Sequence, residues 1–147
     1  MPEGLAGRVC IAGVGCTRFG DLASAPGTGG PTLHELAAAA AREALEDAGM
    51  RGPDVGALYA GGVSLPTSHP RSTAADLAAW IGMRLSPAVP VDAAGATTSV
   101  GVGLATEAIA SGVIDTALVV GVGAGRSTPR GAASARARRR GARSPTG

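Results

Sequence analysis

The feature that most constrains the fold is an alternation of short apolar runs with segments of helical periodicity over the first 123 residues. Between the runs lie three segments in which apolar residues recur at helical spacing. Continuously apolar strands that alternate with helices indicate a mainly parallel sheet with right-handed crossovers and helices on both faces. The sequence therefore predicts an α/β fold of order β-α-β-α-β-α-β, with strands at residues 8–14, 55–65, 88–92 and 115–122.

The best-defined helix is predicted for residues 32–49. Thr32 and Glu35 have the spacing of a capping box, in which each side chain binds a backbone N–H that the first turn leaves free. Gly49 follows the last periodic position, where glycine commonly ends a helix. Two further helices are predicted, a short one over residues 74–83 and a long one over residues 97–111.

The charge of the chain is divided between two unlike parts. Residues 1–125 hold six arginines and all eleven acidic residues, a net charge of −5, whereas residues 126–147 hold seven arginines and no acid. The end of the chain consists almost only of Gly, Ala, Arg, Pro and Ser, without apolar periodicity, which is typical of disorder. We therefore predict an α/β domain over residues 1–123 and a disordered Arg/Ala/Gly-rich tail over residues 124–147.

Two interpretations of this tail remain open. Its composition, in a chain without Lys, Asn or Gln, is consistent with translation of a GC-rich gene in a shifted reading frame. Seven arginines could also bind nucleic-acid phosphate without sequence preference, but the tail has no aromatic residue to stack on bases. Nucleic-acid binding is therefore the less favoured interpretation.

The sequence lacks the patterns of a membrane span, a secretory signal and a metal site. No apolar run reaches the roughly 18 residues of a membrane span, and no secretory signal pattern opens the chain, so we expect a cytoplasmic protein without membrane partners. The two cysteines, Cys10 and Cys16, form no CxxC motif and have no nearby histidine, so no metal site is predicted. Cys10 is expected to be buried in the first strand and Cys16 to lie in a loop.

Two glycine-containing turns could carry chemistry. Gly13 and Gly15 follow the first apolar run, but Arg18 stands where a dinucleotide motif has its third glycine and no helix follows, so a plain turn is favoured. Residues 91–112 read as a strand, a turn of small residues and a helix. Such a turn faces the N–H groups and positive end of the helix, where a cysteine would be a good nucleophile. The alternative is a corner that needs small residues for packing.

Taken in order, three segments resemble the N-terminal half of thiolases. The opening VCIAGVGCTRFGDL, the helix TLHELAAAAAREALEDAGM and the run VPVDAAGATTSVGVGLATEAIASGVIDTALVVGVG are similar to successive motifs of that family, at matching spacing over about four-fifths of the chain. The resemblance is strongest to thiolases of the sterol-carrier-protein type and to their bacterial lipid-transfer relatives. It implies the N-terminal half of a thiolase fold, which dimerises through this half in the complete enzymes.

The resemblance also implies a reaction and a site. Thiolases condense or cleave acyl-CoA thioesters through an acyl-cysteine, with the CoA thioester as substrate and no further cofactor. The motif aligns Gly95 with the nucleophilic cysteine, and Gly123 with an acidic residue, so no catalytic residue of the family is retained. His34 and His69 lie outside the catalytic histidine motifs of the family. The hydroxyls near Gly95, on Thr97, Thr98 and Ser99, would need an adjacent base to react.

Three functional hypotheses follow. The first is a truncated thiolase-like acyl-CoA acyltransferase, of the acetyl-CoA acetyltransferase or lipid-transfer type, which is inactive on its own because Gly95 replaces the cysteine. The second is a fragment of a cysteine-less thiolase-like retro-aldolase acting on steroid or other acyl-CoA side chains. The third is a non-catalytic module that binds acyl-CoA or pairs with a thiolase subunit as a homo- or hetero-oligomer.

Overall fold

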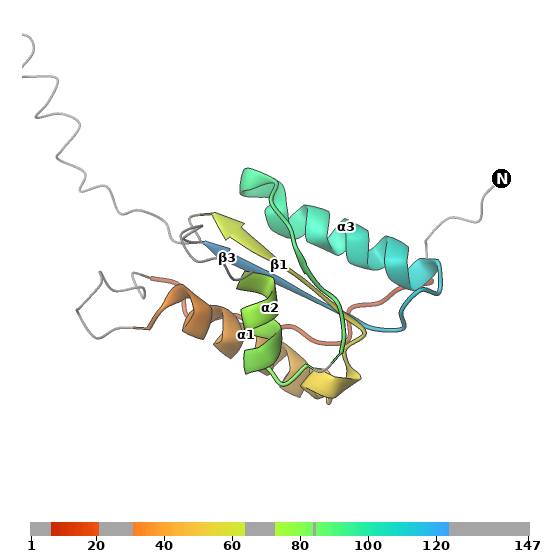
Figure 1. Cartoon of the computed structure of the whole chain (residues 1–147), viewed down its shortest axis with the longest axis horizontal. Coiled ribbons are helices and arrows are strands. Elements are labelled where there is room, and N and C mark those ends of the chain that lie inside the picture. Colours follow the sequence, from red (N-terminus) through yellow and green to blue (C-terminus); the bar gives the residue numbers. More distant parts are fainter. Residues whose placement is uncertain (1–6, 21–30, 64–72, 84, 124–147) are drawn as a thin grey trace, which may run out of the picture.

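A computed structural model describes residues 7–20, 31–63, 73–83 and 85–123, and it has the predicted α/β architecture. A three-stranded parallel sheet has the order β2-β1-β3, and helices cover both of its faces (Figure 1). Helix α3 lies on one face, while α1 and α2 lie on the other (Figure 1). The strands are β1 (Ala57–Val63), β2 (Ala88–Pro90) and β3 (Ala117–Gly123), and the helices are α1 (Leu33–Asp47), α2 (Thr73–Trp80) and α3 (Thr97–Ala110).

The main core lies between the sheet and the α1–α2 layer. Leu58 of β1 is fully buried there, and β3 contributes Leu118 and Val120. Helix α1 meets these strands with a face of small residues, among them Ala38 and Ala41, which are each 1% exposed. Small side chains let the helix axis approach the sheet closely, so the alanine-rich periodicity of the sequence is a packing surface.

Helix α3 has apolar side chains on several sides, and the described residues cover only one of them. Its inner side lies on the sheet, where a Cβ added at Gly101 would be 3.0 Å from Cγ1 of Val119. On its two flanks, Val100 and Leu104 on one and Val102 on the other remain 40–48% exposed. A helix that is apolar all round is normally buried on all sides. None of the described helices is long and apolar enough to cross a bilayer.

The strand predicted for residues 8–14 is wrong. Residues 9–18 lie outside regular secondary structure and beside α1 rather than in the sheet. The N–H of Val14 donates to a carboxylate oxygen of Asp47 at 2.8 Å, and that of Cys16 donates to Glu43 at 3.1 Å. The run therefore has the composition of a strand, but it has no strand as a neighbour. Carboxylates of α1 accept the N–H groups of Val14 and Cys16 instead.

Two burial predictions also differ from the structure. Cys10 is exposed, as is Cys16, because the segment that carries them lies outside the sheet. The apolar sequence of residues 115–122 predicts a strand buried on both faces, but β3 has only Leu118 and Val120 buried, since its other face is covered by α3 alone. The predicted tail, residues 124–147, lies outside the described residues.

The capping box at the start of α1 is present as predicted, and it makes the stability of the helix depend on pH. Glu35 accepts the backbone N–H of Thr32 at 2.6 Å, while the Thr32 hydroxyl accepts the N–H of Glu35 at 3.2 Å. The hydrogen bonds from the Thr32 backbone and side chain hold the pKa of Glu35 below its ordinary value. Because that pKa is lowered in the folded state, the stabilisation is full above the ordinary carboxyl pKa of about 4.3 and is lost as the pH falls through the folded value.

We therefore expect wild type to be more stable than Glu35→Gln at pH 7, with a difference that shrinks steadily below about pH 4. Urea unfolding at a series of pH values measures this difference. Glu46→Gln, on the same helix but outside the capping box, is the matched control for replacing a carboxylate by an amide. A difference for Glu35→Gln that stays constant from pH 7 to pH 3 would contradict the role of the ionised carboxylate.

Candidate functional site

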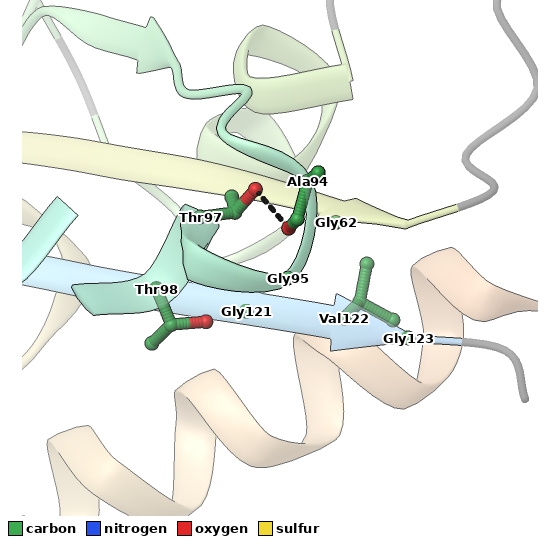
Figure 2. Close-up of a pocket in the computed structure, with 8 residues that line it drawn as sticks. All are labelled: Gly62, Ala94, Gly95, Thr97, Thr98, Gly121, Val122 and Gly123. Carbon is green, nitrogen blue, oxygen red and sulfur yellow. Dashed lines mark hydrogen bonds between the residues drawn. The ribbon is translucent and has the colours of Figure 1, made fainter. Parts of the chain in front are cut away.

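A pocket of about 240 Å³ lies where the carboxyl ends of β1 and β3 meet the start of α3 (Figure 2). In parallel α/β sheets, ligands commonly bind beyond the carboxyl ends of the strands, so the position is that of a binding site. The described residues that line the pocket are small and uncharged: Gly62, Ala94, Gly95, Thr97, Thr98, Gly121, Val122 and Gly123. Sequence reasoning singled out Gly95, and the strand pairing brings Gly62 and Gly121 to it.

The turn that enters the pocket is fixed by a buried threonine. Thr97 is 5% exposed, and its hydroxyl donates to the carbonyl oxygen of Ala94 at 2.8 Å while accepting the N–H of Ala93 at 3.0 Å. Ala94 has a φ of 49°, a left-handed conformation that costs an alanine roughly 1–2 kcal/mol. Asp92 accepts the N–H of Ala94 at 3.3 Å. These contacts hold the strained residue in place and so set the position of the residue that follows it.

Gly95 follows this strained residue, in the short 3₁₀ turn Ala94–Ala96 that leads into α3. A Cβ added at Gly95 would meet no atom within 4 Å, and its φ lies outside the left-handed range. The fold therefore does not require glycine at this position. The interpretation of the corner as one that needs small residues for packing does not apply to Gly95 itself.

Other glycines around the pocket are required by close contacts. A Cβ at Gly61 would overlap the carbonyl oxygen of Val91 and lie 2.7 Å from Cγ2 of Thr97. A Cβ at Gly62 would overlap the carbonyl oxygen of Val122, and one at Gly121 would overlap the hydroxyl of Thr98. At Gly62 and Gly121, which line the pocket, neighbouring atoms therefore lie directly against the backbone.

The remaining candidates lie apart from this pocket or outside the described residues. The ring of His34 packs at a tilt against Trp80, with 6.1 Å between ring centroids, and His69 lies outside the described residues. Gly13 and Gly15 pack against the backbone of α1 in a stretch that forms neither a turn nor the start of a helix, so neither the dinucleotide motif nor the plain turn is present. Within the described ranges, no three His, Cys, Asp or Glu side chains gather in a way that could hold a metal ion.

The chemical capacity of the pocket follows from its lining. None of the eight lining residues has a thiol, an imidazole or a carboxylate, and the Thr97 hydroxyl is engaged within the turn. Ser99 is exposed and does not line the pocket. The described part of the site can therefore bind a neutral group, but it contains no nucleophile paired with a base.

Comparison with known sequences gives one family. The sequence profile described as "Thiolase, N-terminal domain" matches residues 9–143. No curated protein sequence matches the chain significantly. The profile match extends past residue 123, where sequence analysis places the end of the α/β domain, and that boundary stays a prediction.

Solved structures with similar folds are synthases and related enzymes. The 3-oxoacyl-[acyl-carrier-protein] synthase III of Aquifex aeolicus VF5 superposes with a TM-score of 0.60 at 24% identity, over 67% of this chain and 34% of that one, which shows a shared fold. FabH, the corresponding synthase III of Xanthomonas oryzae, is 33% identical over 60% of this chain and 26% of its own, with a TM-score of 0.54. Xanthomonas campestris OleA, with bound lauric acid and lauroyl-CoA, is 31% identical over the same shares, with a TM-score of 0.53.

The chain spans only a quarter to a third of the length of these three proteins. The resemblance to sterol-carrier-protein-type thiolases is thus supported at the level of the superfamily, while the three structures compared are of the FabH and OleA type.

Proposed function

The chain belongs to the thiolase family as an N-terminal domain, and from this premise we propose that it is part of a thiolase-like acyl-CoA enzyme in which Gly95 holds the nucleophile position. The observation that carries the proposal is that Gly95 lies in the pocket ahead of α3, with open space where a side chain would be. Glycine offers no side-chain nucleophile, so no acyl-enzyme forms at this position. The chain by itself binds the thioester and leaves it intact.

The substrate class is supported by the pocket and by the compared structures. OleA is described with bound lauroyl-CoA. A pocket of about 240 Å³ is smaller than the roughly 300–1,000 Å³ of complete small-molecule sites, and it accommodates the acyl end of a thioester rather than a whole CoA. Its uncharged lining matches a neutral thioester and offers nothing to the CoA phosphates. Coenzyme A is in this proposal part of the substrate and not a cofactor.

A partner half is supported by the exposed flanks of α3. Val100 and Leu104 on one flank of α3 and Val102 on the other are exposed apolar side chains that a second thiolase half would cover, in a longer chain or in an associated subunit. Assignment to the sterol-carrier-protein or lipid-transfer type, and a cytoplasmic location, stay predictions.

Calorimetric titration with lauroyl-CoA, followed by intact-protein mass spectrometry, tests this function. We expect saturable binding and an unchanged protein mass after prolonged incubation. Acetyl-CoA and free coenzyme A serve as controls for the contribution of the acyl chain, and both should bind more weakly. An absence of heat with every ligand would refute acyl-CoA binding. In a Cys10→Ser, Cys16→Ser background, which removes both exposed thiols, a mass increase of one lauroyl group would refute the role of Gly95.

Gly95 also favours a second candidate, the cysteine-less retro-aldolase, because that reaction needs no acyl-cysteine. The replacement of the family's acidic residue by Gly123 is a further departure from a working thiolase. Assays of thiolysis and of aldol cleavage on the chain joined to its complementary half would separate the two. Rapid thiolysis would exclude the aldolase, whereas cleavage of a β-hydroxyacyl-CoA without added thiol would support it.

A further inference from the structure

We propose that Thr98 is a positioning residue, whose hydroxyl donates a hydrogen bond to the carbonyl oxygen of the acyl thioester, on the premise of the proposed function that the pocket binds such a ligand. Two hydroxyls line the pocket, and they are not equivalent. That of Thr97 is engaged with Ala93 and Ala94 inside the turn. That of Thr98 has no hydrogen-bond partner within the described part of the chain, so it is the one side-chain donor among the lining residues that is free to bind a ligand.

Thr98 can lie against β3 because the residue beneath it, Gly121, has no side chain. Figure 2 shows the Thr98 side chain lying over β3, with its hydroxyl on the side of Gly121. A Cβ added at Gly121 would overlap this hydroxyl, and it would lie 3.2 Å from Cβ and 3.3 Å from Cγ2 of Thr98. Thr98 therefore occupies the space that a side chain at residue 121 would fill. The contact places a hydrogen-bond donor at the carboxyl end of β3 before any ligand arrives.

The chemistry of the lining determines which ligand group this donor suits. A hydroxyl can donate one hydrogen bond, and a thioester carbonyl is an uncharged acceptor. None of the eight lining residues carries a charged side chain that would pair with a carboxylate or phosphate. The remaining lining side chains, on Ala94 and Val122, are apolar and suit the first carbons of an acyl chain. Thr98 thus orients the carbonyl, whereas the apolar lining accepts the chain.

The test compares a ligand that has the carbonyl with one that lacks it. Wild type, Thr98→Val and Thr98→Ser are titrated with lauroyl-CoA and with S-dodecyl-CoA, a thioether of equal chain length. A neutral hydrogen bond contributes about three- to ten-fold in affinity. We expect Thr98→Val, which keeps the shape of the side chain, to lose that factor for lauroyl-CoA alone. Thr98→Ser keeps the hydroxyl and should retain most of the preference for lauroyl-CoA over the thioether.

The other outcomes are distinct from one another. An equal loss for both ligands in Thr98→Val would mean that Thr98 acts by packing, and it would overturn the proposal. Equal affinities of wild type for the ester and the thioether would overturn it as well, while the proposed acyl-CoA binding would stand. If wild type bound neither ligand, the proposed function itself would fail. Circular dichroism of each variant confirms that the fold is retained.

Discussion

Gly95→Cys is expected to introduce a thiol that is alkylated roughly three- to ten-fold faster at pH 7 than the same thiol introduced by Gly103→Cys. Both positions are open, because a Cβ at either glycine meets nothing within 4 Å. They differ in their place along α3: Gly95 precedes its first turn, whereas Gly103 lies in its middle. The N–H groups and positive end of the helix stabilise a thiolate at its start, which lowers the thiol pKa there.

The measurement is the rate of iodoacetamide modification as a function of pH, in a background carrying Cys10→Ser and Cys16→Ser. The background is needed because both native thiols are exposed and would react. The rate for Gly95→Cys should rise at lower pH than the rate for Gly103→Cys. Coincident profiles would show that position 95 lacks the environment of a nucleophile site, and they would count against its alignment with the family cysteine.

Local signals of the sequence predicted the elements whose interactions are also local. Thr32 and Glu35 interact across three residues, so the start of α1 could be read directly. The same holds for its end, where Gly49 has the left-handed φ of 66° that the pattern of the sequence predicts. The strand predicted at residues 8–14 failed because its apolar composition does not specify a partner. Whether another strand or a side chain of α1, such as the Asp47 carboxylate that accepts the N–H of Val14, binds this segment is decided by tertiary structure.

The candidate site was predictable to a similar degree. The order of motifs placed Gly95 between a strand and a helix, and the structure has it there. The rest of the lining comes from β1 and β3, which are separated in the sequence by α2, β2 and α3. Their register pairs Gly61 with Gly121, which no local pattern predicts. Sequence reasoning treated the hydroxyls of Thr97 and Thr98 alike, because only the hydrogen bonds of the turn reveal that the first is engaged and the second is not.

The second large effect is expected for Gly61→Ala, which should destabilise the fold at or above the upper end of the roughly 1–3 kcal/mol typical of overpacking. The added methyl group would overlap the carbonyl oxygen of Val91 and press on Cγ2 of Thr97, 2.7 Å away. A carbonyl oxygen belongs to the backbone and cannot rotate aside, so β1 and the turn after β2 must separate. Gly103→Ala is the matched control, since it adds the same methyl group in open space within α3.

Gly103→Ala should instead stabilise the chain by about 0.5–1 kcal/mol, because alanine loses less backbone entropy than glycine in a helix. Urea unfolding followed by circular dichroism measures both variants. The two shifts in midpoint should have opposite signs, and equal small shifts would contradict the close approach of Gly61 to Val91. Because Thr97 fixes the turn that holds Gly95, the displacement caused by Gly61→Ala should also weaken lauroyl-CoA binding in the fraction that stays folded. Unimpaired binding in that fraction would show that binding does not depend on the turn held by Thr97, and that the ligand binds elsewhere.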